Sequence, residues 1–165
     1  MKFIQTTENK IFTLDKLKFQ IAAWRVLNKT IAFTNGCFDI LHEGHIYSLS
    51  QAAKEADYLI VGVNSDSSVK RLGKDSNRPI NNENSRAIIL ASLSIVDTAI
   101  IFNEDTPYEL ITTLMPDVLV KGGDYTLEQI VGSKEVITNG GRVVINKIIE
   151  GFSTTNIIKK IASTN

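Results

Sequence analysis

The chain has 165 residues, of which 43% are hydrophobic and 22% charged, which is enough for one well-filled core and short for two. Eighteen basic residues balance eighteen acidic ones, so no overall charge attracts the protein to nucleic acid or to an anionic membrane. Cys37 is the only cysteine, which excludes an intrachain disulfide and favours a reducing compartment. The first ten residues do not resemble a signal peptide, and no run of about eighteen apolar residues occurs. We therefore expect a single cytoplasmic domain over 1–165 that binds neither nucleic acid nor membrane.

Hydrophobic periodicity divides the chain into a short leader and an α/β core. After a polar leader over residues 1–12, apolar residues recur at three- and four-residue spacing, which predicts an amphipathic helix over 13–28 with Trp24 in the core. Five apolar runs follow, at residues 30–34, 58–63, 98–102, 117–120 and 142–146. Segments with helical periodicity separate them, at 44–56, 83–93, 107–114 and 126–138. Because the runs are apolar on consecutive positions, the region 29–165 is predicted to be a Rossmann-like α/β core, a doubly wound sheet of five parallel strands with helices on both faces.

Two helix starts and one long connection can be read directly from the residues. Thr106-Pro107-Tyr108-Glu109 combines a capping box with proline at the first helical position, and Thr126-Leu127-Glu128-Gln129 forms a second box. The polar stretch over 70–84 is the longest connection, and it carries Arg71, Lys74 and Arg78. Loops of this length are often functional, so this connection is a candidate part of a site.

Polar and glycine-rich loops follow four of the five predicted strands. They lie at residues 35–45, 64–66, 121–124 and 151–155. In open parallel sheets, ligands bind outside the carboxyl ends of the strands, at the point where the strand order reverses. The sequence therefore predicts that these four loops share one crevice.

Both histidines of the chain lie in one tetrapeptide, His42-Glu43-Gly44-His45, at the predicted start of a helix. A helix N-terminus binds phosphate through unpaired backbone N–H groups, two imidazoles would add donors, and glycine at position 44 leaves room for the ligand. Zinc needs three or four ligands, whereas the chain has no other histidine and a single cysteine. The tetrapeptide thus favours phosphate binding over a metal site or an ordinary helix start with two solvated histidines.

The segment from Gly36 to His45 resembles the signature of the HxGH nucleotidyltransferases, the cytidylyltransferase-like superfamily, which transfers a nucleoside monophosphate from a triphosphate to a phosphorylated acceptor. The resemblance implies that His42 and His45 contact the triphosphate and stabilise charge as the α-phosphorus becomes five-coordinate. The nucleotide- and phosphate-binding residues that it implies are Thr34, Asn35, Gly36, Cys37, Phe38, Gly44, Arg86, Gly122, Asp124, Ser153 and Thr154. Taken alone, Arg86 reads as a surface arginine and the hydroxyls at 153–154 as an ordinary helix cap. Phosphoryl-type transfer needs no thiol nucleophile, so Cys37 is expected to be a small packing residue whose backbone N–H faces the phosphate.

A narrower resemblance extends over nearly the whole chain from about Leu14 onward. It rests on Gly62-Val63-Asn64-Ser65-Asp66, Arg78-Pro79-Ile80, Ser85-Arg86-Ala87 and Lys121-Gly122-Gly123-Asp124-Tyr125. These segments are similar to the heptose 1-phosphate adenylyltransferases of bacterial surface-polysaccharide synthesis. The implied reaction joins ATP and D-glycero-D-manno-heptose 1-phosphate into ADP-heptose and releases pyrophosphate. Acceptor binding would fall to Asp39, Asn64, Asp66 and Lys121, and Lys74, whose position in its loop is shifted relative to this family, would assist His42 and His45 in catalysis.

The resemblance also implies a cofactor and partners. Mg²⁺ would be held mainly by phosphates and water, with Asp39 acting either on the metal or as a buried residue that stabilises the turn. A homodimer is expected, since relatives are often dimers, and heptose 1-phosphate would come from a separate kinase. Two alternatives stay open: a glycerol 3-phosphate cytidylyltransferase and a module that binds nucleotide without turnover. The chain contains neither the G-x-G-x-x-G of dehydrogenases nor a P-loop.

Overall fold

The computed structural model describes residues 6–73, 78–147 and 154–162, and its strands form one five-stranded sheet. The strands are β1 (Ile31–Gly36), β2 (Tyr58–Asn64), β3 (Thr98–Phe102), β4 (Val118–Gly122) and β5 (Arg142–Asn146). They lie in the order β3-β2-β1-β4-β5, and each adjacent pair is parallel. The predicted α/β fold with a doubly wound parallel sheet is confirmed, and the strand order reverses between β1 and β4.

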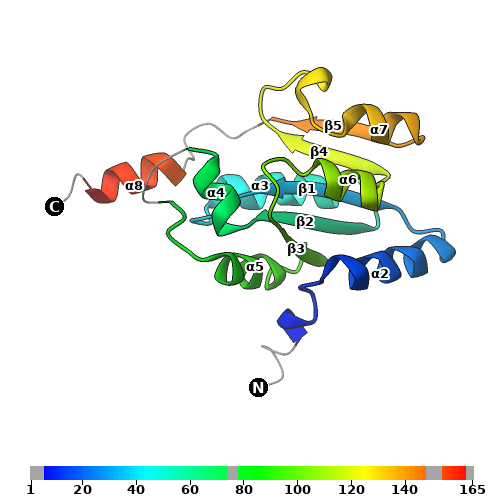
Figure 1. Ribbon diagram of the computed structural model, residues 1–165, viewed down its shortest axis with the longest axis horizontal. Helices are drawn as coiled ribbons and strands as arrows, with labels where there is room; N and C mark the ends of the chain where they lie inside the picture. The colour runs from blue at the N-terminus through cyan, green and yellow to red at the C-terminus, as the bar shows by residue number, and fades with distance from the viewer. Residues whose placement is uncertain (1–5, 74–77, 148–153, 163–165) are drawn as a thin grey trace.

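Helices cover both faces of this sheet (Figure 1). They are α2 (Leu14–Val26), α3 (Glu43–Ala53), α4 (Asp66–Arg71), α5 (Glu83–Ala91), α6 (Tyr108–Leu114), α7 (Ser133–Thr138) and α8 (Thr154–Ala162), with a 3-10 turn, η1, at Leu127–Gln129. Helices α2, α6 and α7 contribute to the core cluster that contains Phe33, and α3 and α5 contribute to the one that contains Ala32. Neighbouring residues of β1 thus enter opposite cores, which explains why this strand is apolar on consecutive positions.

Three strands run further toward their carboxyl ends than the sequence predicted. β1 continues to Gly36, β2 to Asn64 and β4 to Gly122. Gly36 pairs with Val63, and Gly122 pairs with Asn146. The hydrogen bonds of a sheet come from the backbone, so a ladder continues through residues whose side chains have low strand propensity. The glycine-rich ends are therefore part of the rigid sheet.

Two helical segments differ from the prediction. The expected helix over 126–138 is divided, because Ile130 is extended and Gly132 has a φ of +81°. A Cβ atom on Gly132 would lie 2.7 Å from Ile111, so glycine is required by space as well as by conformation. Helix α4, which the sequence analysis did not predict, begins after Ser65, whose hydroxyl accepts a hydrogen bond from the backbone N–H of Ser68 at 3.1 Å.

The two predicted capping boxes have different outcomes. The backbone N–H of Thr126 donates to the Gln129 side chain at 2.9 Å, which confirms the second box. The helix at the first box, α6, begins one residue later than expected, with Pro107 as the cap and no side-chain capping bond. In the leader, Ile11 forms a parallel β-bridge with Ala99 of β3, so this part of the leader lies along the edge of the sheet. Among the described residues, no helix is both long and apolar enough to cross a membrane.

Candidate functional site

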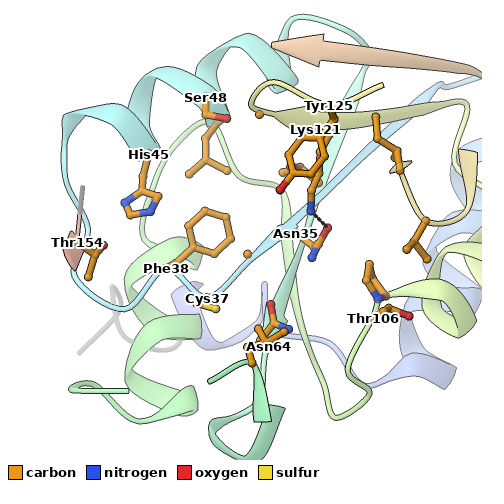
Figure 2. Close-up of a pocket in the computed structure, with 18 of the residues that line it drawn as sticks. Asn35, Cys37, Phe38, His45, Ser48, Asn64, Thr106, Lys121, Tyr125 and Thr154 are labelled. Carbon is orange, nitrogen blue, oxygen red and sulfur yellow. Dashed lines mark hydrogen bonds between the residues drawn. The ribbon is translucent and has the colours of Figure 1, made fainter. Parts of the chain in front are cut away.

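A cavity of about 760 Å³ opens at the carboxyl ends of β1 and β4, where the strand order reverses. The predicted site residues that line it are Thr34, Asn35, Gly36, Cys37, Phe38, His42, Gly44, His45, Asn64, Lys121, Gly122 and Thr154. They come from all four loops that the sequence singled out, so the predicted shared crevice is confirmed. Figure 2 shows His45 and Thr154 on one side of this cavity and Lys121 and Tyr125 across it.

Sequence reasoning missed several residues that line the cavity. They include Ser48, Asp105, Thr106, Pro107, Tyr125 and Gln129, and an apolar wall of Ile111, Leu119, Ile130 and Val131. Arg78 also lines the cavity; it stands in the long connection that the sequence marked as a candidate part of a site, where it was given no role of its own. Residues 105–107 follow β3, the one strand whose carboxyl end the sequence analysis left out. The rule about carboxyl ends, applied to every strand, would have found them.

Four predicted site residues do not line the cavity: Asp39, Asp66, Arg86 and Asp124. Asp124 is exposed on the loop after β4. The other three belong to a polar network behind the turn between β1 and α3, which is described below. Two further predicted residues, Lys74 and Ser153, lie outside the described residues.

The two histidines form a stacked pair at the start of α3. His42 is the residue that caps the helix, and the ring centroids of His42 and His45 are 3.8 Å apart. The backbone N–H of His42 donates to Nδ1 of His45 at 3.4 Å. In a neutral imidazole one nitrogen accepts and the other carries the proton, so this bond leaves Nε2–H of His45 as a donor for a ligand. The arrangement adds a directed side-chain donor to the positive end of a helix.

The surroundings of these imidazoles favour their neutral forms. Burial lowers the pKa of His45 to about 4, and the positive charges of His42 and Arg78 contribute to the shift. Burial also lowers the pKa of His42. Both rings are therefore neutral near pH 7 when no ligand is bound. A bound polyanion would raise both pKa values, since a nearby negative charge stabilises the imidazolium.

The low pKa of His45 predicts a pH dependence of stability. Between its ordinary value of 6.5 and about 4, the unfolded chain binds a proton at His45 that the folded chain does not. The free energy of unfolding therefore falls as the pH is lowered through this window. We expect the melting temperature of His45→Gln to fall less steeply than that of the wild type between pH 7 and 4.5, as measured by calorimetry. Parallel curves for the two proteins would contradict the assignment.

The turn between β1 and α3 has an uncommon backbone conformation. Phe38 has a φ of +50°, which bulky side chains rarely adopt. Its ring is buried and lies with its centroid 5.4 Å from that of His45. A Cβ atom on Gly36 would lie 3.0 Å from the same ring. Phe38 thus packs between the glycine end of β1 and the histidine pair, and it fixes the position of His45.

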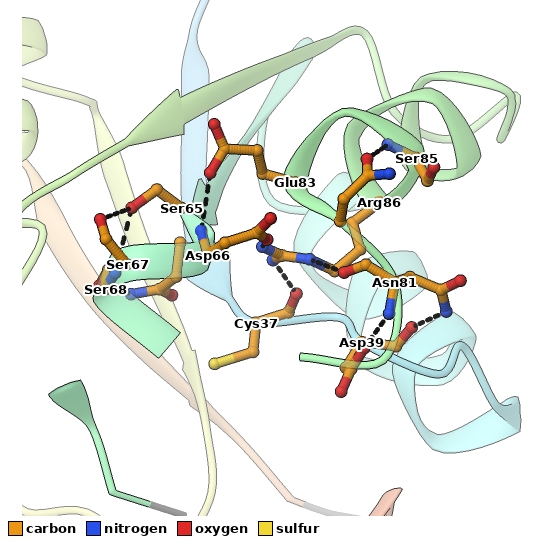
Figure 3. A network of polar contacts seen from close by, with 12 residues as sticks. Cys37, Asp39, Ser65, Asp66, Ser67, Ser68, Asn81, Glu83, Ser85 and Arg86 are labelled. Atoms are coloured by element: carbon orange, nitrogen blue, oxygen red, sulfur yellow. Dashed lines mark hydrogen bonds and ion pairs between the residues drawn. The ribbon is translucent and has the colours of Figure 1, made fainter. Parts of the chain in front are cut away.

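A buried arginine clamps this turn from behind (Figure 3). Arg86 is fully buried, and its Nη1 donates to the backbone oxygen of Cys37 at 2.6 Å. Nη2 donates to Asp66 at 2.7 Å, and Nε donates to the backbone oxygen of Asn81 at 3.0 Å. One guanidinium therefore joins the end of β1, the start of α4 and the loop before α5. This geometry gives Arg86 and Asp66 a positioning role, in place of the direct contacts with nucleotide and acceptor that the resemblance implied.

Asp39 is likewise occupied by the chain itself. Its Oδ1 accepts hydrogen bonds from the backbone N–H groups of Ile80 and Asn81 at 2.8 and 2.9 Å, and its Oδ2 accepts one from Nε of Arg78 at 3.2 Å. The side chain has no exposed surface. The structure therefore favours a role for Asp39 as a buried residue that stabilises the turn. A role in binding metal or sugar is less compatible with these bonds.

Lys121 occupies the opposite wall of the cavity, at the end of β4. Its Nζ donates to the side-chain oxygen of Asn35 at 3.2 Å and lies 5.8 Å from the ring centroid of Tyr125 (Figure 2). Asn64, at the end of β2, is held by a 3.0 Å hydrogen bond from its Nδ2 to Ser68. Two cations thus line the cavity: Lys121 at the end of β4, and Arg78, which is bonded to Asp39 in the turn that leads to the histidine pair.

Known proteins resemble this chain over most of its length. The protein named "Bifunctional protein HldE" from Rhodospirillum rubrum is 51% identical over 158 residues, which cover 96% of this chain and 32% of that protein. The protein of the same name from Shigella flexneri is 52% identical over 151 residues, which cover 92% of this chain and 31% of that protein. The chain thus spans about a third of the length of these curated relatives.

Two solved structures have the same fold. A lipopolysaccharide core biosynthesis protein from Thermoplasma volcanium has a TM-score of 0.61 and 31% identity, over 73% of this chain and 97% of that chain. A pantoate-beta-alanine ligase from Francisella tularensis has a TM-score of 0.60 at 17% identity, over 93% of this chain and 76% of that chain, and shows the fold alone. Residues 33–160, which contain the cavity and both histidines, match the cytidylyltransferase-like description, and the chain belongs to that family.

Proposed function

We propose that this protein transfers AMP from ATP to D-glycero-D-manno-heptose 1-phosphate, giving ADP-heptose and pyrophosphate for surface-glycan synthesis. Membership of the cytidylyltransferase-like family supports transfer of a nucleotidyl group. The choice of substrates is supported by the motifs around residues 62–66 and 121–125 and by about 50% identity to proteins named HldE. The relative named for lipopolysaccharide core biosynthesis supports a role in surface glycans. The observation that carries the proposal is the stacked histidine pair at the start of α3, facing the cavity.

The triphosphate would enter as its Mg²⁺ complex. Among the described residues, no group of three His, Cys, Asp or Glu side chains could hold a metal ion, and both oxygens of Asp39 are engaged. We infer that phosphate oxygens and water supply most of the Mg²⁺ ligands, which is a common coordination of this ion at nucleotide sites. The ion would offset part of the triphosphate charge.

In the proposed reaction, a phosphate oxygen of the sugar phosphate attacks the α-phosphorus in line as the bond to pyrophosphate breaks. The acceptor is already largely a dianion near neutral pH, so no strong general base is required. Nε2–H of His45, the backbone N–H groups at the start of α3 and the Thr154 hydroxyl would bind phosphate oxygens at one side of the cavity. Catalysis of this kind depends on positioning and charge stabilisation.

The acceptor would bind toward the opposite wall. We infer that Lys121 contacts the phosphate of the acceptor, because it is a cation at the cavity wall across from His45 (Figure 2). Asn64 lies at the adjacent strand end, where an amide can bind sugar hydroxyls. The hydrogen bond between Lys121 and Asn35 would align the lysine before substrate arrives.

The test is pyrophosphate release from the purified protein with Mg²⁺. ATP, CTP, GTP and UTP are each combined with both anomers of heptose 1-phosphate and with glycerol 3-phosphate. We expect release with ATP and one heptose anomer alone, which would also identify the anomer.

Two outcomes would overturn the proposal in different ways. Release only with CTP and glycerol 3-phosphate would keep the transfer chemistry and replace the substrates. Absence of release in every combination, with nucleotide binding retained, would indicate a module without turnover. Light scattering of the same preparation tests the expected homodimer, which stays a prediction.

A further inference from the structure

Arg78 is a buried cation at the cavity whose partners within the described chain do not use all of its donors. The residue is 6% exposed and lines the cavity, so its guanidinium is nearly removed from bulk water. Its Nε donates to Oδ2 of Asp39 at 3.2 Å. A guanidinium carries five N–H donors in a fixed fork, and buried donors of charged groups are normally satisfied. Among the described residues, no hydrogen bond engages the Nη1 or Nη2 atom of Arg78.

Asp39 does not need this arginine for all of its hydrogen bonds. The Oδ1 atom of Asp39 already accepts two backbone N–H groups, from Ile80 and Asn81. The pair therefore leaves hydrogen-bond donors of Arg78 unused, whereas both carboxylate oxygens of Asp39 already accept hydrogen bonds. An arginine whose Nε is anchored by a buried carboxylate has a fixed orientation, and its two terminal nitrogens remain available to a bidentate anion.

The location of Arg78 identifies which anion it suits. Its positive charge contributes to the lowered pKa of His45. Its partner Asp39 lies one residue before Ile40, and the backbone oxygen of Ile40 accepts a hydrogen bond from the Thr154 hydroxyl at 3.4 Å. Arg78, the start of α3 and the start of α8 thus converge on one end of the cavity. Lys121 stands on the opposite wall, next to Asn35 (Figure 2). The end beside Arg78 is the one where a group with several negative charges is best stabilised.

We propose that Arg78 binds the pyrophosphate portion of the nucleoside triphosphate, so that its terminal nitrogens hold the leaving group while His45 contacts the α-phosphate. This inference rests on the proposed nucleotidyl transfer and adds a binding residue to the same site. A bidentate arginine–phosphate contact strengthens as charge builds up on the leaving group, so Arg78 would act on kcat as well as on affinity.

The test measures binding of inorganic pyrophosphate with Mg²⁺ by calorimetry, which needs no acceptor and no turnover. We expect Arg78→Met to weaken pyrophosphate binding about 10- to 100-fold, the scale for losing a charge-assisted bidentate contact. Arg78→Lys should lose less affinity for pyrophosphate, because lysine keeps the positive charge although it lacks the paired donors of the guanidinium. The matched control is Arg142→Met: Arg142 pairs with Glu55 at 2.7 Å at the amino end of β5, away from the cavity, and its loss should leave the affinity unchanged.

A double variant separates binding from a merely structural role. Arg78→Met leaves the buried carboxylate of Asp39 without its cation, and the additional change Asp39→Asn removes that charge while keeping an oxygen for Ile80 and Asn81. We expect the double variant to recover the melting temperature and to remain deficient in pyrophosphate binding. Recovery of both would overturn the inference, as would a single variant that binds like the wild type. A wild type that binds no pyrophosphate at all would instead contradict the proposed function.

Discussion

Replacing His42 or His45 by alanine is expected to lower kcat by about 100-fold or more, the scale for losing one preorganised donor to a developing negative charge. The reason is geometric. His45 accepts from the backbone of His42 through Nδ1 and therefore presents Nε2–H, and Phe38 packs against its ring. Steady-state pyrophosphate release measures the effect, and melting temperatures show whether the variants remain folded.

Glu43, one of the two residues between the histidines, provides a matched control. Glu43 is exposed on the first turn of α3, and Glu43→Ala should change kcat by less than about threefold, since an exposed side chain that contacts no reacting group contributes little. His45→Gln, which keeps a side-chain N–H, should retain more activity than His45→Ala. Turnover near the wild-type level in both alanine variants would refute the role of the histidine pair.

Replacing Arg86 by methionine is expected to give the largest loss of stability, about 3–5 kcal/mol, because one partner of a buried ionic network is removed. The change would leave the carboxylate of Asp66 without its cation and the backbone oxygens of Cys37 and Asn81 without a donor. Unsatisfied buried acceptors carry the full cost of their desolvation. For a chain of this length the melting temperature should fall by roughly 10 °C.

Arg71→Met is the control for this effect. Arg71 pairs with Asp105, but both side chains are largely exposed, so its loss should cost less than about 1 kcal/mol. Urea unfolding of both variants compares the two losses directly. A loss for Arg86→Met no larger than that for Arg71→Met would mean that the network behind the turn does not hold the site.

Local patterns were sufficient for the order of the elements but not for their exact ends. Consecutive apolar residues marked all five strands, because β1 to β4 are buried between two layers of helices and the edge strand β5 packs partly buried valines against both cores. The strand ends at Gly36 and Gly122 were missed, since their pairing partners, Val63 and Asn146, lie in other strands. Helix α4 was missed because a six-residue segment carries too short a periodic pattern to stand out from a polar connection.

The sequence by itself determined the parallel α/β architecture and the tetrapeptide His42-Glu43-Gly44-His45 at the end of the first strand. Both follow from local chemistry, since apolar runs, helix starts and a histidine motif are contiguous in the chain. Only the tertiary structure decided what the charged residues do. Arg86 meets an oxygen 49 residues away and Arg78 a carboxylate 39 residues away, so the first became a clamp and the second a cation at the cavity. The role of a charge depends on which partners surround it and how much water is excluded, and folding alone brings those partners together.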